Sequence, residues 1–489
     1  MKNCLLAIDQ GTSATKCVLV DDHGHIVAKS AVPLGERYPQ PGWVEQDAEE
    51  IWTSVQTAVR DCLARNDGVR VAGVGLSTQR ESAVIWDRRT GQALTPVLSW
   101  QDRRTVALSD RIGHGAGVEA YVRERSGLPL DPMFSALKIC WLLDGIDPDR
   151  QRSRAGQLVA GTIDAYLLHR LGAEAVIEVG NASRTQLLDV HTFQWDDGLL
   201  ELFNIPRAAL PRIAASVGRL ADAGRLHPSL AAVPVAGVMA DSHAALFAHG
   251  AFQPGEVKAT MGTGSSVMGL APRNAPMHQG LCLTVAWDAG QGPAQALEGN
   301  IRSAGATLRW IGELFGIGSD EAAQIAAHTS SDGIMLVPGF SGLGAPWWDA
   351  HAVGLLAGLT LKTTRNELFA AALESIAHQV ADVLAAMDAS GVRVSRLLVD
   401  GGPSRNAHLR QLLSGFIGRP VVHCTDPELS ALGVAHLAGL GTGLWSWDDL
   451  HSLPRAQQAS DVPPASEDVA SQRRRWLHAV ERARLRDPR

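Results

Sequence analysis

Short apolar runs separated by polar turns open the chain. Residues 4–8 are apolar, residues 9–13 (DQGTS) form a polar turn, and residues 16–20 alternate before a second turn at residues 22–24. Alternation with period two around a short glycine-containing connection predicts a β-hairpin. The chain therefore begins as strand, turn, strand, and not as strand, turn, helix.

A helical pattern follows the hairpin. Asp47 is a suitable N-cap, Glu49 and Glu50 stand in the first turn where the helix dipole favours acids, and apolar residues recur at helical spacing as far as Leu63. The apolar run over residues 71–76 then predicts a buried strand.

The same order of elements returns near the middle of the chain. Residues 257–261 predict a strand, residues 262–266 (GTGSS) a turn, and residues 267–270 a second strand. This repetition predicts an internal duplication. We expect two α/β lobes, residues 1–250 and 251–489, with a ligand bound in a central cleft between them.

Later elements follow from capping and turn signals. Thr364 and Glu367 form a capping box for a helix running to about Met387, and residues 396–400 predict a strand before a helix from Asn406. The end of the chain, with prolines at 463 and 464 and an arginine run at 473–475, predicts a polar linker and a surface helix after about residue 465.

Composition limits the class of protein. With 489 residues, 45% hydrophobic and 19% charged, the chain is long enough for two or three domains and is neither collagen-like, disordered nor a coiled coil. Its 13 tryptophans outnumber its 9 phenylalanines and 3 tyrosines, an unusual division among the aromatics. The net charge of -7 offers no footprint for nucleic acid or an anionic membrane, so we expect a small-molecule partner.

The six cysteines contain no CxxC pair, which predicts reduced and buried thiols. The first residues lack a long apolar region with a cleavage site, and no run approaches the length of a membrane span. We therefore expect a cytoplasmic protein.

Two turns have the composition of phosphate sites. A turn of glycine with serine or threonine exposes successive N–H groups and hydroxyls, as at residues 11–13 and 262–265. Such a turn often only closes a hairpin, but its occurrence at equivalent places of two lobes favours phosphate binding. Asp9 precedes the first turn and either initiates it or holds Mg²⁺ through water. The Walker pattern is absent, and the glycines at 439–443 predict a helix terminus.

Longer strings resemble one family, the FGGY carbohydrate kinases, and within it the glycerol kinases. They are residues 9–12 (DQGT), 41–45 (PGWVE), 79–81 (QRE), 100–104 (WQDRR), 181–184 (NASR) and 342–346 (GLGAP). The likeness runs from about residue 4 to residue 445. One family signature, around residues 133–143, is similar except for Gly145 in place of a polar residue, and a second, residues 354–374, is complete. The resemblance implies an actin-like ATPase (ribonuclease H-like) fold of two duplicated lobes that close over Mg²⁺, ATP and a polyol or sugar.

The resemblance also implies the residues of the ATP site. These are Thr12, Ser13, Lys16, Gly262, Thr263, Gly264, Gly305, Arg309, Gly402 and Asn406. Arg309 stands where glycerol kinases have glutamine.

For the acceptor, the resemblance assigns Asp241 as the catalytic base, Arg80 and Glu81 as partners of the hydroxyls, and Trp100 as an apolar wall. A carboxylate at a helix start can take the hydroxyl proton, and a donor beside an acceptor suits vicinal hydroxyls. Taken alone, such an aspartate is more often a helix N-cap than a base, a pair like Arg80 and Glu81 is more often exposed, and a tryptophan like Trp100 more often lies in the core.

Three pocket residues depart from glycerol kinases. Met133 replaces a tyrosine, Ser242 a glutamine and Ser266 an aromatic residue. These changes predict a wider pocket and an acceptor larger than glycerol, either a longer polyol or a ketose as in xylulokinases.

Other interpretations have less support. The same fold serves non-catalytic nucleotide-binding proteins, but those need no polyol pocket. His23 and His25 with neighbouring aspartates form a turn rather than a metal site, and residues 473–475 predict a solvated helix face rather than an RNA contact. Residues 218–233 lack the glycine-rich loop associated with sugar-bisphosphate regulation. The resemblance implies a homodimer or homotetramer.

Overall fold

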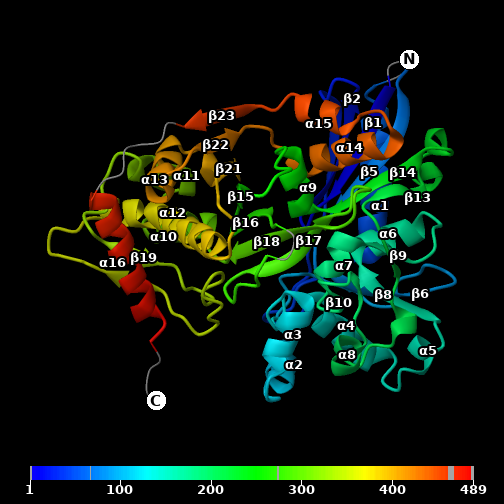
Figure 1. The fold of residues 1–489 in the computed structure, drawn as a ribbon, viewed down its shortest axis with the longest axis horizontal. Coiled ribbons are helices and arrows are strands. Elements are labelled where there is room, and N and C mark those ends of the chain that lie inside the picture. Colours follow the sequence, from blue (N-terminus) through cyan, green and yellow to red (C-terminus); the bar gives the residue numbers. More distant parts are fainter. Residues whose placement is uncertain (1–2, 67, 273–274, 461–466, 486–489) are drawn as a thin grey trace. The chain divides into compact units, whose positions relative to one another are not determined.

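The computed structural model describes residues 3–66, 68–272, 275–460 and 467–485 (Figure 1). The chain forms two compact units. The first unit comprises Met1–Gly250, Leu283–Gln295 and Glu428–Pro454, and the second comprises Ala251–Cys282, Ala296–Pro427 and Arg455–Arg489. Each unit thus collects segments that are distant in sequence.

The first unit contains a six-stranded sheet in the order β13, β14, β5, β1, β2, β3. The hairpin predicted from the opening residues is confirmed, since β1 pairs antiparallel with β2. β5 runs parallel to both β1 and β14, while β13 and β3 pair antiparallel with β14 and β2. The strands are β1 (Asn3–Gln10), β2 (Ala14–Asp21), β3 (Ile26–Pro33), β5 (Arg70–Thr78), β13 (Val217–Asp222) and β14 (Pro234–Ala240).

The second unit repeats this pattern. Six neighbouring strands of its seven-stranded sheet lie in the order β23, β22, β21, β15, β16, β18, and each neighbouring pair runs in the same relative direction as its counterpart in the first unit. The predicted duplication is therefore confirmed. The strands are β15 (Glu256–Met261), β16 (Ser265–Leu270), β18 (Ala294–Ile301), β21 (Arg396–Gly401), β22 (Val421–Cys424) and β23 (Gln457–Ser460).

Helices cover both faces of the first sheet. α1 (Ala48–Leu63) begins after Asp47, whose side chain accepts from the N–H groups of Glu49 and Glu50 as predicted, and it packs on β2 and β3. α14 (Leu429–Thr442) packs on β1, β5 and β14. A Cβ at Gly75 would lie 2.2 Å from the carbonyl oxygen of Val434, so the glycines of β5 permit this close approach. α14 is apolar on all sides, which explains why it lies in a core.

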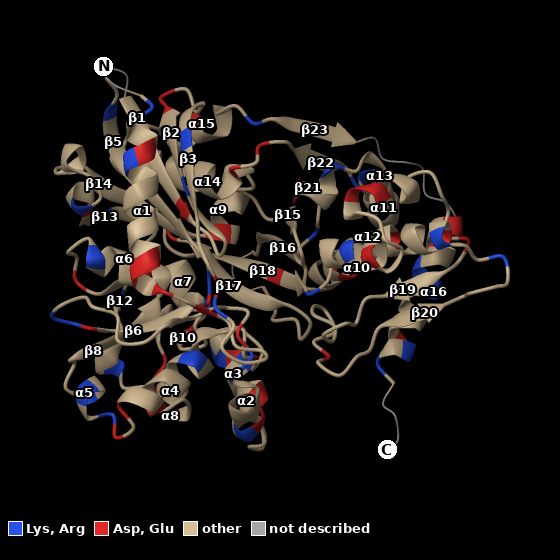
Figure 2. Ribbon diagram, turned by 180° about the vertical axis from the view of Figure 1, so that it is seen from behind, with Lys and Arg blue, Asp and Glu red and all other residues tan. Residues whose placement is uncertain are grey.

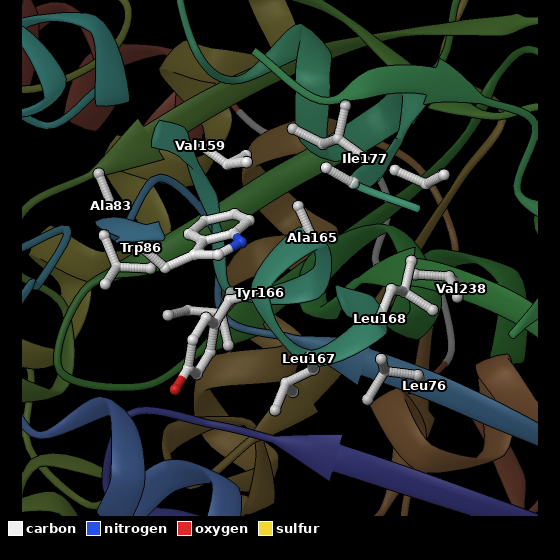
Figure 3. Close-up of a cluster of buried hydrophobic side chains, with 14 of the residues drawn as sticks. Leu76, Ala83, Trp86, Val159, Ala165, Tyr166, Leu167, Leu168, Ile177 and Val238 are labelled. Carbon is white, nitrogen blue, oxygen red and sulfur yellow. The ribbon is translucent and has the colours of Figure 1, made fainter. Parts of the chain in front are cut away.

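A second layer of the first unit is built on the sheet β4 (Glu45–Gln46), β7 (Val97–Leu98), β6 (Ala83–Asp87) and β8 (Leu158–Thr162). Figure 3 shows its core, where Trp86 of β6 lies beside Tyr166 of α6 (Ile163–Arg170), with ring centroids 5.6 Å apart and edge to face. The other elements of this unit are α2 (Val106–Gly113), α3 (Val118–Ser126), α4 (Ser135–Ile146), α5 (Gln151–Arg154), β9 (Val176–Glu178), α7 (Val179–Ser183), β10 (Leu188–Asp189), β11 (Gln194–Trp195), α8 (Asp197–Leu202), β12 (Arg212–Ala214), α9 (Asp241–Ala248), most of β17 (Cys282–Trp287) and α15 (Trp447–Ser452).

The second unit is organised around α12 (Arg365–Ala389), whose predicted capping box of Thr364 and Glu367 is confirmed. By length and composition α12 resembles a membrane span, but 89% of its most apolar window is buried inside the structure, as expected of a core helix. α10 (Gly305–Leu314), α11 (Ser319–Ala326) and α13 (Ala407–Ile417) pack against it. β19 (Met335–Val337) and β20 (Leu355–Ala357) form a further small sheet.

The last helix, α16 (Glu467–Ala483), is only partly a surface helix. Trp476 is buried, its indole N–H donates to Asp382 at 2.7 Å, and its ring stacks on His378 with centroids 4.9 Å apart. Arg473 pairs with Asp382, so the expectation of a solvated helix face is wrong for this arginine. The prolines at 463 and 464 lie outside the described residues.

The distribution of charged residues and the state of the cysteines agree with the expectations from the sequence. Figure 2 shows lysines and arginines lying among aspartates and glutamates on the helices of both units. All six cysteines are free and buried, as predicted.

A buried acid makes the stability of the first unit depend on pH. Burial raises the pKa of Asp164 from 3.8 to about 6, although Thr162 donates to its carboxylate. The folded state therefore binds this proton more tightly than the unfolded state. The resulting contribution to the free energy of unfolding is fully present below about pH 4 and is lost as the pH rises through about 6. Asparagine does not titrate, so its stability lacks this pH dependence. As the pH rises from 4 to 7.5, we expect the free energy of unfolding of Asp164→Asn to increase by about 2–3 kcal/mol relative to that of the natural protein. Urea unfolding at both pH values measures this difference.

The matched control is Asp110→Asn, which changes an exposed aspartate of α2. A stability difference between Asp164→Asn and the natural protein that stays constant with pH would contradict the expectation.

Candidate active site

Three parallel strands of the first unit end at one edge of its sheet. β1 and β14 flank β5, with Asp9 opposite Ser77 and Thr78 opposite Ala240. Because the carboxyl ends of neighbouring parallel strands meet at the same edge, the residues that follow β5 and β14 come together with Asp9.

These residues form a cluster of opposite charges. The Arg80 Nε atom lies 3.5 Å from an Asp241 carboxylate oxygen and 3.7 Å from a Glu81 carboxylate oxygen, and Arg184 Nε donates to Glu81 at 2.6 Å. The side chains of Arg80 and Glu81 are only 8% and 4% exposed, whereas that of Asp241 is 36% exposed. The alternative of an ordinary exposed pair at Arg80 and Glu81 is therefore wrong.

Glu81 has a strained backbone, with φ at 60°. A left-handed conformation is unusual for a non-glycine residue and costs of order 1–3 kcal/mol, so surrounding contacts must maintain it. Arg184 holds the carboxylate of Glu81, and the hydroxyl of Ser135 donates to its carbonyl oxygen at 3.0 Å. Such strain is typical of functional sites.

Asp241 is the first residue of α9 and not its N-cap. The cap position belongs to Ala240, and the Asp241 carboxylate accepts from the N–H of Ser242 at 2.6 Å. The hydroxyl of Ser430 donates to the carbonyl oxygen of Asp241. The alternative of a pure capping role is therefore wrong, and the carboxylate is oriented by its neighbours.

Trp100 is 37% exposed and does not belong to the core. Its indole N–H donates to the Thr12 hydroxyl at 3.0 Å, so the side chain lies beside the turn of residues 11–13. Met133 is half-buried on the turn that leads into α4, next to Phe134, whose ring packs 5.0 Å from the Arg184 guanidinium.

The first of the two predicted phosphate turns, residues 11–13, connects β1 and β2. Ser13 is exposed, and the carbonyl oxygen of Thr12 accepts from the side chain of Gln46 at 2.7 Å. Lys16 forms an ion pair with Glu428 at 2.8 Å. Sequence reasoning missed Glu428, because it lies 412 residues away along the chain and no local signal marks it.

Asp9 fits a hard cation. It accepts from Ser77 at 2.9 Å, and its pKa is raised to about 6, first by burial and then by the negative charge of Asp241. A divalent cation near two carboxylates would relieve this repulsion. Among the described residues no three His, Cys, Asp or Glu side chains are grouped as a metal site, so water and phosphate oxygens would complete the coordination.

The backbone N–H groups of His23 and His25 both donate to the Asp21 carboxylate, which confirms the predicted turn there.

The second predicted phosphate turn, residues 262–265, is hydrogen-bonded to the start of α10. Gly305 N–H donates to the carbonyl oxygen of Gly262 at 2.9 Å, and Arg309 donates to the Thr263 hydroxyl at 3.3 Å. A Cβ at Gly264 would lie 2.4 Å from the carbonyl oxygen of Ile301. Only glycine fits there without moving the backbone.

Three other predicted residues of the second unit have structural partners. Asn406 is the N-cap of α13, with its amide oxygen accepting from Leu409 and its NH₂ donating to the carbonyl oxygen of Ala323. Gly402 follows β21 at the start of a short 3₁₀ turn. Ser266 donates to the buried Glu298 at 2.7 Å. The ligand contacts expected of these residues stay predictions.

Repeated sheets of this topology, each with a glycine and hydroxyl turn after its first strand, define an actin-like ATPase fold. The chain belongs to the FGGY family of carbohydrate kinases: the model of the family's N-terminal domain matches residues 4–248 and that of its C-terminal domain matches residues 257–442. It is thus an enzyme that transfers a phosphoryl group to an alcohol.

Individual relatives agree with this assignment. The chain is 42% identical to a glycerol kinase of Citrifermentans bemidjiense over 90% of each chain, and 40% identical to an apulose kinase of Pectobacterium atrosepticum over 99% and 98% of the two chains. Among solved structures it resembles the glycerol kinase of Plasmodium falciparum with ADP, with a TM-score of 0.93, 29% identity and 99% of each chain covered.

Proposed function

We propose that this kinase transfers the terminal phosphoryl group of ATP, with Mg²⁺, to a hydroxyl of a polyol or ketose larger than glycerol. ATP as the donor and a polyol or sugar as the acceptor follow from the family and its glycerol kinase members. The observation that carries the proposal is the cluster of Arg80, Glu81 and Asp241, which joins a donor, an acceptor and a partly exposed carboxylate.

Asp241 accepts the proton of the attacking hydroxyl in this proposal. Phosphoryl transfer needs alignment and charge stabilisation more than covalent help, so one oriented carboxylate is sufficient. The N–H of Ser242 orients the carboxylate, and the Arg80 guanidinium balances its charge.

Arg80 and Glu81 bind neighbouring hydroxyls of the acceptor. Arginine donates and glutamate accepts, so together they satisfy both hydrogen-bonding functions of a diol. Arg184 keeps Glu81 in place, and the ring of Trp100 covers the carbon chain of the acceptor.

Backbone N–H groups and hydroxyls bind the nucleotide. Asp9 holds Mg²⁺ through water, and this ion, when bound, neutralises charge on the phosphates. The nucleotide residues are Thr12, Ser13 and Lys16 in the first unit and Gly262, Thr263, Gly264, Gly305, Arg309, Gly402 and Asn406 in the second.

The acceptor is larger than glycerol because three side chains are smaller or more flexible than in glycerol kinases. Met133, Ser242 and Ser266 replace a phenol, an amide and an aromatic ring, and a three-carbon ligand would leave space and unpaired polar groups. The 40% identity to an apulose kinase supports a ketose as an alternative to a longer polyol.

A panel of acceptors tests this specificity. With ATP and Mg²⁺, and ADP release as the measurement, we expect kcat/KM for a five-carbon polyol or ketose to exceed that for glycerol by about tenfold or more. Restoring the three side chains in Met133→Tyr, Ser242→Gln and Ser266→Phe should shift preference towards glycerol. Clearly best turnover of glycerol by the natural protein would contradict the larger acceptor.

We also propose a cytoplasmic location and a homodimer or homotetramer. Six free, buried cysteines are typical of a reducing compartment, and the oligomeric state rests on the family resemblance.

A further inference from the structure

Lys138, in the first half of α4, has a fully buried side chain. Its ammonium group folds back to the start of its own helix and donates to three successive carbonyl oxygens, those of Pro132 at 2.8 Å, Met133 at 2.5 Å and Phe134 at 3.3 Å. All three of its N–H donors are thus matched to backbone carbonyls of one turn.

Placing the Lys138 ammonium group at this buried helix start costs free energy. The N-terminus of a helix carries positive partial charge, which disfavours a cation, and burial removes the hydration of the ammonium. Burial is the main reason why the pKa of Lys138 is lowered from 10.5 to about 8. The charges that face it are Glu81, Asp102 and Asp131, which favour its charged form, and Arg103, which opposes it.

The turn that Lys138 holds carries three contacts of the acceptor site. Met133 is one of the proposed determinants of acceptor size. The ring of Phe134 packs on the guanidinium of Arg184, which in turn holds the carboxylate of Glu81. Ser135 donates to the carbonyl oxygen of Glu81. One ammonium group therefore fixes the turn that supports the strained Glu81 from two sides.

We propose that Lys138 is a positioning residue for the acceptor, which sets the place of Met133 and Glu81 by binding the carbonyl oxygens of residues 132–134. This inference rests on the proposed acceptor site. It assigns to Lys138 no contact with the acceptor or with the reacting atoms.

The test is steady-state kinetics of Lys138→Met, which keeps the length of the side chain and removes its charge and donors. The acceptor used is the one with the highest kcat/KM in the panel. We expect the KM for this acceptor to rise about 10- to 100-fold, while kcat and the KM for ATP change less than about threefold. Lys362→Met, at an exposed lysine of the second unit, is the matched control and should leave all three constants unchanged.

Ser135→Ala is a milder second variant in case Lys138→Met does not fold. It removes only the bond to the Glu81 carbonyl oxygen and should raise the acceptor KM about threefold to tenfold, again without affecting the KM for ATP. Equal losses for acceptor and ATP, or an unchanged acceptor KM in a folded Lys138→Met protein, would overturn the inference.

A pH profile adds a readout that a purely structural role would not produce. As Lys138 loses its proton above about pH 8, one carbonyl oxygen loses its donor, so the acceptor KM of the natural protein should rise there. Lys138→Met should lack this rise, and its persistence would count against Lys138. If the natural protein phosphorylates no acceptor of the panel, the proposed acceptor site fails instead, which separates the two failures.

Discussion

Asp241→Asn is expected to lower kcat for acceptor phosphorylation by about 10²–10⁴-fold, because the amide cannot take the hydroxyl proton. Asparagine has nearly the same shape, and its oxygen still accepts from the N–H of Ser242, so the start of α9 should keep its geometry. ATP binding should change less than about threefold. ADP release with the best acceptor measures kcat, and calorimetry measures the affinity for ATP.

Asp320→Asn is the control for this variant, since Asp320 also stands in the first turn of a helix, α11, but is exposed and outside the proposed site. It should keep full activity. Transfer by Asp241→Asn at more than about a tenth of the natural rate would refute Asp241 as the base.

Gly264→Ala should lower kcat/KM for ATP by about 10²-fold or more. The added Cβ would lie 2.4 Å from the carbonyl oxygen of Ile301 and 3.2 Å from that of Arg302, so the phosphate turn must move against the backbone of β18. A displacement of about 1 Å at a site that aligns reacting groups is sufficient for such a loss. Initial rates at varied ATP and saturating acceptor measure it.

The matched control is Gly318→Ala in the same unit, where an added Cβ meets no atom within 4 Å and φ is -74°. It should leave the kinetic constants unchanged. Normal ATP kinetics in Gly264→Ala, with the fold intact by circular dichroism, would mean that residues 262–265 do not bind phosphate.

The proposed acceptor site around Asp241 and the proposed phosphate turn at residues 262–265 depend on different physical features. In the first unit a strained, charged cluster surrounds Asp241, and the proposed binding of hydroxyls there would account for its energy cost. In the second unit the phosphate turn depends on close backbone packing at Gly264 rather than on charge. Substitutions in the cluster around Asp241 should therefore change the kinetic constants for the acceptor, whereas substitutions at residues 262–265 should change those for ATP.

Local signals in the sequence were sufficient for many elements. The hairpin of β1 and β2, the cap at Asp47 and the capping box of α12 depend on residues a few positions apart, and all three are confirmed. The repeated strand, turn, strand pattern also predicted the duplication, because similar local patterns form the same kind of hairpin wherever they occur. The residues of the site were predicted through longer motifs that resemble the FGGY family.

Only the tertiary structure decided which distant groups meet. The ion pair of Lys16 with Glu428, the bond of Arg184 to Glu81, and the return of residues 428–454 to the first unit join segments separated by a hundred residues or more. Composition and periodicity act over a few residues, whereas these contacts arise from packing whole elements together. The same reason applies to α16, whose buried face is defined by the contacts of Trp476 with His378 and Asp382. The sequence by itself thus determined the repeated strands and helices and the glycine and hydroxyl composition of their turns. Tertiary packing decided which charged side chains pair with one another around Asp241.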